Sequence, residues 1–303
     1  MTTAIHSVNL GVADLAKAIR FYQRAFGFVT MGGGSIEDED LKQLWRMEQE
    51  LKGEYVWMAP PEYGTGKSVT LRLMKWSRPG VRIWQSYQYP RDRGLFALSF
   101  RLAAPAEGWQ RLMEAGAFDH ERTRGDHKAS RAALGCDPNG VMLGLSGTED
   151  HDSADAILGA VEIHVGHLDR AKAFYACLGF SSHQPEEEET VSEGFSGNPD
   201  MERIHLHQQG NQNTAGCLEL VRYPGRLGRS LRGRAVPPNY GLVSMTYLCP
   251  SIEKILSQLR QAIDFVPTWQ SGPYDLELMP WGKVRKISLL GPDDEMIELV
   301  EIL

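Results

Sequence analysis

VNLGVADLAKAIRFYQRAFGF, residues 8–28, recurs in altered form as VEIHVGHLDRAKAFYACLGF, residues 161–180. The first residues of each copy alternate between apolar and polar side chains, as in a half-buried strand. Leu15, Ala18 and Tyr22 then recur at the spacing of one helix face, and the second copy repeats them. The stretch therefore predicts a strand followed by a helix, present twice in the chain.

Further pieces of the two halves match in the same order. Gly27 and Gly179 each stand where the end of a helix favours a left-handed residue. The other matched strands are 69–76 with 216–223, 95–102 with 242–248, and 137–146 with 291–300. Helical stretches at 107–116 and 251–262 follow the middle pair. We predict an α+β protein of tandem βαβββ modules, with domains at 1–147 and 157–303 joined by a polar, acidic linker.

Composition narrows the class of protein. The 303 residues suit about two domains, and a net charge of −7 argues against a broad nucleic-acid or anionic-membrane surface. The four cysteines are far apart and form no CxxC pair, which is typical of a reduced cytoplasmic protein. No apolar run is long enough to span a bilayer. We expect a small-molecule partner, no nucleic acid and no membrane, with a homodimer as an open alternative.

The repeated VxDLxxAxxFYxxxxGF element, the LELVRYP strand and the final GPDDEMIELVE strand resemble the vicinal-oxygen-chelate superfamily. This superfamily includes glyoxalase I, extradiol dioxygenases and bleomycin resistance proteins. The resemblance covers almost the whole chain and implies paired βαβββ modules whose mixed sheets curl around a cavity. It specifies the function weakly, because one scaffold hosts many chemistries.

The resemblance also implies positions for a divalent metal such as Fe, Mn, Ni or Zn. With modules paired inside each half, the N-terminal positions fall on Ser7, Arg72, Ala97 and Gly144, none of which suits such a metal. His6 lies beside Ser7 but should point to the other face of its strand. Arg72 is a candidate for binding an anionic ligand group, and a solvated arginine is the alternative.

In the C-terminal half the first-strand positions are Ala160 and Ser244, whereas the two carboxylate positions are kept as Glu219 and Glu298. Each glutamate lies between apolar neighbours, so each should face away from the core that the helices cover. Other candidate substrate-binding or catalytic side chains should project to the same side: Glu162, His164, His205, His207 and Thr246, and Ser244 is a further substrate-binding candidate. His205 and His207 should lie about 6.5–7 Å apart on one face of their strand.

Two hypotheses follow for this half. In one, Glu219 and Glu298 hold a metal together with His207 or His205, or act as acid and base. In the other, the metal site is lost and these residues are polar lining. We expect an enzyme of the lyase, isomerase or ring-opening oxygenase type that acts on an oxygenated, aromatic or polyketide-like molecule. On that view, replacing Glu298 with glutamine abolishes turnover and leaves the fold intact. The alternative is a metal-free protein that binds or sequesters a small molecule.

The connection over residues 35–64 is long for two adjacent strands. Its aromatic residues Trp45, Tyr55, Trp57 and Tyr63 are candidates for lining an apolar pocket. Ordinary core packing explains them equally well.

Overall fold

The structure is a computed structural model of the chain. It describes residues 4–60, 69–84, 91–119, 134–147, 156–182, 201–208, 216–225, 227–278 and 280–303. The linker expected at residues 147–156 and Tyr63 fall largely or wholly outside these ranges. The domain limits 1–147 and 157–303 therefore stay a proposal.

The described residues form four βαβββ modules, as the repeat predicts. Module 1 contains β1 (Ala4–Gly11), α1 (Leu15–Phe26), β2 (Val29–Ile36), an additional helix α2 (Glu39–Leu44), β3 (Gly53–Ala59) and β4 (Thr70–Trp76). Module 2 contains β5 (Gly94–Leu102), α3 (Pro105–Glu114), β6 (Phe118–Asp119), β7 (Leu134–Cys136) and β8 (Met142–Gly147). Module 3 contains β9 (Ile157–His164), α4 (Leu168–Cys177), β10 (Phe180–Ser181), β11 (Glu202–Gln208) and β12 (Cys217–Arg222). Module 4 contains β13 (Gly241–Leu248), α5 (Ile252–Ile263), β14 (Gln270–Leu278), β15 (Gly282–Leu290) and β16 (Met296–Ile302).

The ends of α1 illustrate why these residues fold as they do. The Asp14 carboxylate accepts a hydrogen bond from the backbone N–H of Lys17 at 2.9 Å and so caps the first turn. Gly27 ends the helix at φ 72°, and Gly179 has φ 85° just after α4. Both glycines thus adopt the left-handed conformation that the repeat predicts.

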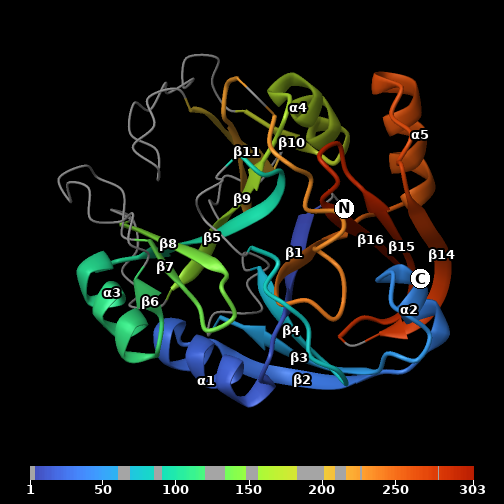
Figure 1. Cartoon of the computed structure of the whole chain (residues 1–303). Coiled ribbons are helices and arrows are strands. Elements are labelled where there is room, and N and C mark those ends of the chain that lie inside the picture. Colours follow the sequence, from blue (N-terminus) through green and yellow to red (C-terminus); the bar gives the residue numbers. More distant parts are fainter. Residues whose placement is uncertain are drawn as a thin grey trace.

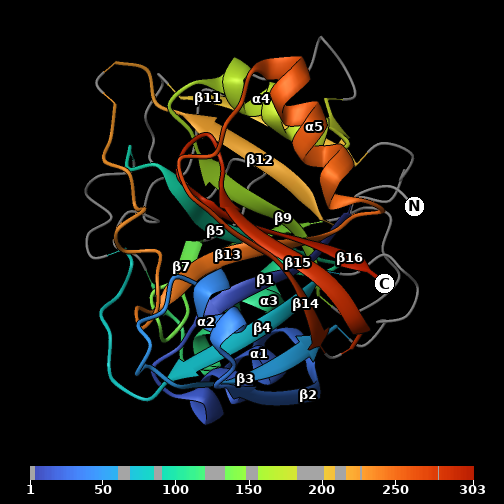
Figure 2. The same cartoon turned by 90° about the vertical axis from the view of Figure 1, so that its right-hand side faces the viewer.

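Within the described ranges the strands form two curled, mixed sheets of eight strands each. Figures 1 and 2 show how the sheets are arranged. Sheet I has the order β14-β15-β16-β13-β1-β4-β3-β2, and sheet II the order β10-β11-β12-β9-β5-β8-β7-β6. Sheet I therefore joins modules 1 and 4 through the antiparallel pair β1–β13. Sheet II joins modules 2 and 3 through β5–β9.

The expected α+β class of tandem modules is confirmed, but the expected pairing of modules inside each half is wrong. Every module presents its first strand as an open edge, and any two such edges can pair. The repeat therefore predicts the modules without predicting which of them are partners. The pairing of modules between halves matters for the site, because the candidate site residues that the sequence places in one half are divided between two sheets.

The helices keep the modules of each half together. Helix α1 packs against α3, and α4 packs against α5 (Figure 1). Phe26 of α1 stacks on Phe100 of β5 with ring centroids 3.8 Å apart, which joins modules 1 and 2. Phe174 of α4 contacts Phe265, just after α5, edge to face with ring centroids 4.9 Å apart, which joins modules 3 and 4. One face of each sheet packs on these helices, and we call the opposite face the polar face.

Candidate functional site

Strand alternation sends a set of polar side chains to the polar face of sheet I. Val8 and Leu10 of β1 belong to the core, whereas Asn9 between them does not. On β16 the same holds for Glu298, whose neighbours Ile297 and Leu299 are both core residues. This outcome agrees with the orientation that the sequence predicts for Glu298.

Glu298 lies between two buried cations. The Lys286 Nζ is 2.6 Å from Glu298 Oε2, and Arg72 Nη1 is 3.7 Å from the same oxygen. Burial lowers the pKa of Lys286 to about 8, although Glu298 opposes this effect. Burial alone would raise the pKa of Glu298, but Lys286 and Arg72 lower it to about 2. The carboxylate is therefore charged at neutral pH and satisfied mainly by cations.

Neutral donors complete the surroundings of this carboxylate. Asn9 Nδ2, Ser244 Oγ and Trp45 Nε1 donate to Glu298 Oε1 at 2.9, 2.5 and 2.6 Å. Thr246 Oγ1 donates to Oε2 at 3.0 Å. We call these residues the Glu298 cluster: Asn9, Trp45, Arg72, Ser244, Thr246, Lys286 and Glu298. The cluster contains four of the predicted site residues, namely Arg72, Ser244, Thr246 and Glu298.

Aromatic rings surround Arg72. Its guanidinium carbon lies 4.0 Å from the centroid of Trp57, 5.4 Å from that of Trp45 and 5.7 Å from that of Tyr55. Trp45 of the long β2–β3 connection and Tyr55 and Trp57 of β3 thus line a polar cluster, not only a core. Because Arg72 is 2% exposed, the alternative of a solvated arginine is wrong.

Strand alternation predicts that His6 points to the face of β1 opposite the Glu298 cluster. In the structure it points to the same face as that cluster. The register of β1 against β13 shifts between Ile5 and Ser7. Such a bulge adds one residue to the strand and so changes the face to which a side chain points. The His6 ring consequently contacts Trp57 and Trp281, with centroids 5.6 and 4.5 Å apart. Burial and the nearby Arg72 lower the pKa of His6 to about 3, so its ring is neutral at physiological pH.

The other predicted residues gather on the polar face of sheet II. Glu162 and Glu219 are register partners on the parallel strands β9 and β12. His164 Nε2 is 2.8 Å from Glu162 Oε1, and His205 Nε2 is 3.6 Å from Glu219 Oε1. Arg203 of β11 forms an ion pair with Glu219 and lies 3.9 Å from Glu162 Oε2. We call these five residues the Glu162 cluster.

The predicted metal set is not brought together. Glu298 is on sheet I, whereas Glu219 and His207 are on sheet II. The His207 ring lies with its Nδ1 3.1 Å from Cys217 Sγ, and His205 is the histidine that approaches Glu219. The first-strand positions are divided as well: Ser7 and Ser244 belong to sheet I, Ala97 and Ala160 to sheet II.

Three important residues were not predicted: Asn9, Lys286 and Arg203. Lys286 pairs in register with Val300, two residues after Glu298, and Arg203 pairs with Val221, two residues after Glu219. The two cations therefore occupy equivalent places in modules 3 and 4. A basic residue on the strand that precedes each glutamate strand was the signal that could have identified them.

Neither donor set suits the divalent metal that the resemblance implies. Two protein cations already lie beside the single carboxylate Glu298, and they would repel a metal ion. On sheet II, Arg203 takes the place between Glu162 and Glu219. Within the described ranges, no three His, Cys, Asp or Glu side chains lie so that they could hold a metal ion.

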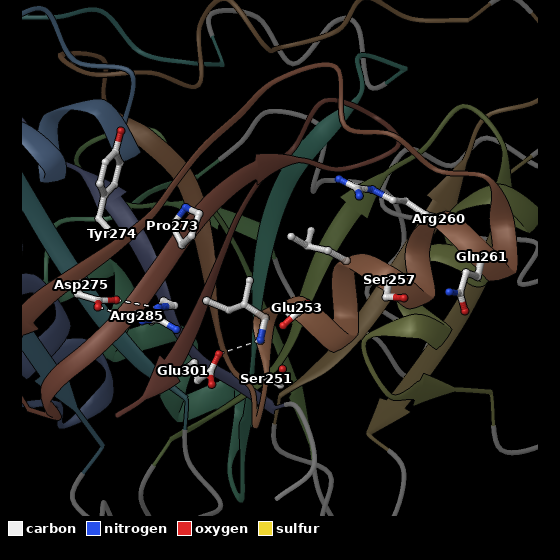
Figure 3. Close-up of a pocket in the computed structure, with 12 residues that line it drawn as sticks. Ser251, Glu253, Ser257, Arg260, Gln261, Pro273, Tyr274, Asp275, Arg285 and Glu301 are labelled. Atoms are coloured by element: carbon white, nitrogen blue, oxygen red, sulfur yellow. Dashed lines mark hydrogen bonds and ion pairs between the residues drawn. The ribbon is translucent and has the colours of Figure 1, made fainter.

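A separate groove of about 950 Å³ lies on the opposite face of sheet I, between α5 and strands β14 and β15 (Figure 3). An ion pair between Asp275 and Arg285, at 2.7 Å, and Arg260 of α5 belong to its lining. None of the predicted site residues lines it. Arg285 precedes Lys286 on β15 and points the other way, so the groove and the Glu298 cluster are on opposite faces.

Comparison with known proteins gives one family match. Residues 4–145 match the family model of the Glyoxalase/Bleomycin resistance protein/Dioxygenase superfamily. This match covers the residues of modules 1 and 2. A search of curated proteins finds no match. No helix among the described residues is long and apolar enough to cross a membrane.

Solved structures share the fold. Glyoxalase I from Zea mays is 16% identical, with a TM-score of 0.68, and the match covers 99% of this chain and 92% of that one. A candidate dioxygenase from Bacillus subtilis is 13% identical, with a TM-score of 0.61, over 99% of this chain and 86% of that one. At these identities the likeness concerns the fold alone.

Proposed function

We propose that the protein binds a small oxygenated molecule with an anionic group at the Glu298 cluster, without a metal. The observation that carries the proposal is charge. Arg72 and Lys286 are both buried and share one carboxylate, Glu298, so the cluster has a positive charge in excess. A buried charge without a counter-charge is costly, and a bound anion would remove that cost.

Unpaired polar atoms on the same face support this proposal. Ser7 Oγ, Ser288 Oγ and Arg72 Nε are buried and have no hydrogen-bond partner among the described residues. Ser7 is the register partner of Thr246, which pairs with Glu298, which in turn pairs with Ser288. The two serines thus lie along one row across the sheet, and Arg72 is in the adjacent row, because its register partner is Asn9. Oxygen atoms of a ligand are the acceptors that they lack.

A second candidate function is catalysis at the Glu162 cluster. A carboxylate that holds an imidazole at 2.8 Å, as Glu162 holds His164, is an arrangement for moving a proton in lyase or isomerase chemistry. Incubation with pools of oxygenated aromatic compounds, followed by mass spectrometry, tests it. Conversion that is lost in the His164→Gln variant supports catalysis, whereas compounds recovered unchanged support binding alone.

The binding proposal predicts the effect of removing Arg72. Arg72→Met leaves Lys286 and Glu298 as a neutral pair, so the fold should persist. Loss of a charge-assisted hydrogen bond should weaken binding of a small carboxylate by roughly 10- to 100-fold. Titration calorimetry with acetate, benzoate, 2-hydroxybenzoate and cyclohexanecarboxylate, with and without EDTA, measures it.

Arg285→Met is the matched control, because Arg285 is on the same sheet but points to the opposite face. It should bind the carboxylates as the wild type does, and EDTA should change nothing. If the wild type binds none of the four, or binds them equally well after Arg72→Met, the proposal is wrong.

A further inference from the structure

The long β2–β3 connection covers the Glu298 cluster. Asp38 caps α2 by accepting hydrogen bonds from the backbone N–H groups of Asp40 and Leu41 at 2.9 and 3.1 Å. Leu41 and Leu44 are buried in the cluster of apolar side chains that also contains Val284 of β15. Trp45 follows the helix directly and is 1% exposed. The segment thus places an indole ring on the polar face of sheet I.

Trp45 makes the contacts that a ligand would make there. Its N–H donates to the Glu298 carboxylate at 2.6 Å. The Lys286 Nζ lies 4.7 Å from the ring centroid, and the guanidinium carbon of Arg72 lies 5.4 Å from it. Cations at these distances are attracted to the face of an aromatic ring. The cluster therefore already binds a flat aromatic group with a hydrogen-bond donor, and that group belongs to the protein.

The indole also closes the site. Arg72, Lys286 and Glu298 are each 2% exposed or less. A ligand can reach the three charged groups only if part of their cover moves. Trp45 is the cover that contacts all of them, so its departure would free the carboxylate and both cations together.

The segment is held by the buried side chains Leu41, Leu44 and Trp45 and by several contacts near the surface. The Tyr274 hydroxyl donates to the Gln43 side chain, and this contact is exposed. The Arg46 guanidinium carbon lies 5.4 Å from the Trp269 ring. Arg46 itself has φ 56°, a left-handed conformation that strains a residue with a Cβ. Exposed contacts of these kinds contribute about 0.5–1.5 kcal/mol each, whereas burial of a large apolar side chain contributes more, so the segment moves only when ligand binding compensates for the exposure of its buried side chains.

We infer that Trp45 occupies the place of the ligand, and that the ligand is an aromatic ring with an O–H donor and an anionic oxygen. The ring replaces the indole, the O–H replaces the indole N–H on Glu298, and the anionic oxygen meets Arg72 and Lys286. Residues 38–47 move outward as the ligand enters. This inference rests on the proposed function and adds the chemical class of the ligand.

Two probes of equal charge test the inference. 2-Hydroxybenzoate has the ring, the O–H and the carboxylate, whereas cyclohexanecarboxylate has only the carboxylate on a saturated ring of similar size. Trp45→Ala removes the internal occupant, so 2-hydroxybenzoate should bind at least roughly 10-fold tighter than to the wild type, a gain of about 1.4 kcal/mol. Cyclohexanecarboxylate should gain clearly less. Trp76→Ala is the control for a cavity of the same size, since Trp76 is buried on the same sheet without a contact to Glu298.

A measurement on the wild type makes the test independent of how the variant folds. Saturating 2-hydroxybenzoate should increase hydrogen exchange in residues 38–47 and leave β4 and β16 unchanged. If both probes bind the wild type, but Trp45→Ala favours neither and exchange in the segment does not rise, the inference is wrong and the proposed function stands. If neither probe binds any of these proteins, and acetate and benzoate do not bind the wild type either, the proposed function falls as well.

Discussion

Replacing Glu298 with glutamine should lower the free energy of unfolding by about 3–5 kcal/mol, the usual cost of removing one partner from a buried ion pair. Lys286 and Arg72 would then lie buried without the carboxylate that compensates them. The amide would also present N–H groups toward the Lys286 ammonium, donor against donor. The sequence alone predicts that this variant keeps its fold, and the structure gives a physical reason to expect the opposite.

A second substitution should restore part of the stability that Glu298→Gln loses. In Glu298→Gln with Lys286→Met, one of the two uncompensated charges is gone, so the double variant should be more stable than the single one. Urea unfolding at pH 7 measures all three proteins. A single variant within about 1 kcal/mol of the wild type would show that the cluster does not depend on this charge balance.

The difference in the free energy of unfolding between the wild type and Glu298→Gln should also depend on pH, in a direction that follows from the pKa of Glu298. The pKa of Glu298 in the folded protein is about 2, below its ordinary value of 4.5. Its contribution to stability is therefore fully present above pH 4.5 and is lost as the pH falls toward 2. Wild type and Glu298→Gln should consequently approach each other in stability below pH 4.5.

Much of the fold follows from the sequence because it depends on local patterns. The alternation in residues 4–11 and the helix spacing after Asp14 specify a strand and a helix without reference to the rest of the chain. Gly27 ends the helix for a local reason too, its positive φ. The partner of each module depends instead on which first strands meet, and all four first strands offer similar edges.

The candidate site was only partly predictable for the same reason. Local alternation correctly sends Glu219 and Glu298 away from the helices, but the exchanged pairing separates them onto two sheets. Trp45 enters the cluster from a connection whose path no periodicity specifies. His6 changes face through a bulge between Ile5 and Ser7, and one additional residue in a strand leaves no pattern in the sequence.

The two sheets share one arrangement of a buried glutamate beside a buried cation, but the net charge around it differs between them. Each C-terminal module has a buried glutamate, and the preceding strand supplies a cation at the same register, Lys286 beside Glu298 and Arg203 beside Glu219. On sheet I the partner module adds the cation Arg72, whereas on sheet II the strand β9 adds the carboxylate Glu162. Arg203 therefore serves two carboxylates at once.

Replacing Arg203 with methionine should accordingly destabilise the protein by about 3–5 kcal/mol at pH 7, because two buried carboxylates lose their common partner. Arg222→Met is the matched control. Arg222 pairs with Glu202 on the same two strands, at 2.9 Å, but both side chains are more than a third exposed. Such an ion pair contributes about 0–1 kcal/mol, so the control should lose little.

The pH dependence identifies the cause of the Arg203→Met loss. In the wild type, burial would raise the pKa of Glu162, but Arg203, His164 and His205 together outweigh it and lower the pKa, with Arg203 contributing most. The stability from Glu162 is then present above its ordinary value of 4.5 and lost below it. Without Arg203, only His164 and His205 oppose the effect of burial, so the pKa of Glu162 should rise and the variant should lose stability relative to the wild type as the pH rises through 4.5. Urea unfolding at pH 4.5 and 7.5 should give a much smaller difference from the wild type at the lower pH. An equal difference at both values would mean that methionine disturbs packing and that the charge of Arg203 is not what holds this face together.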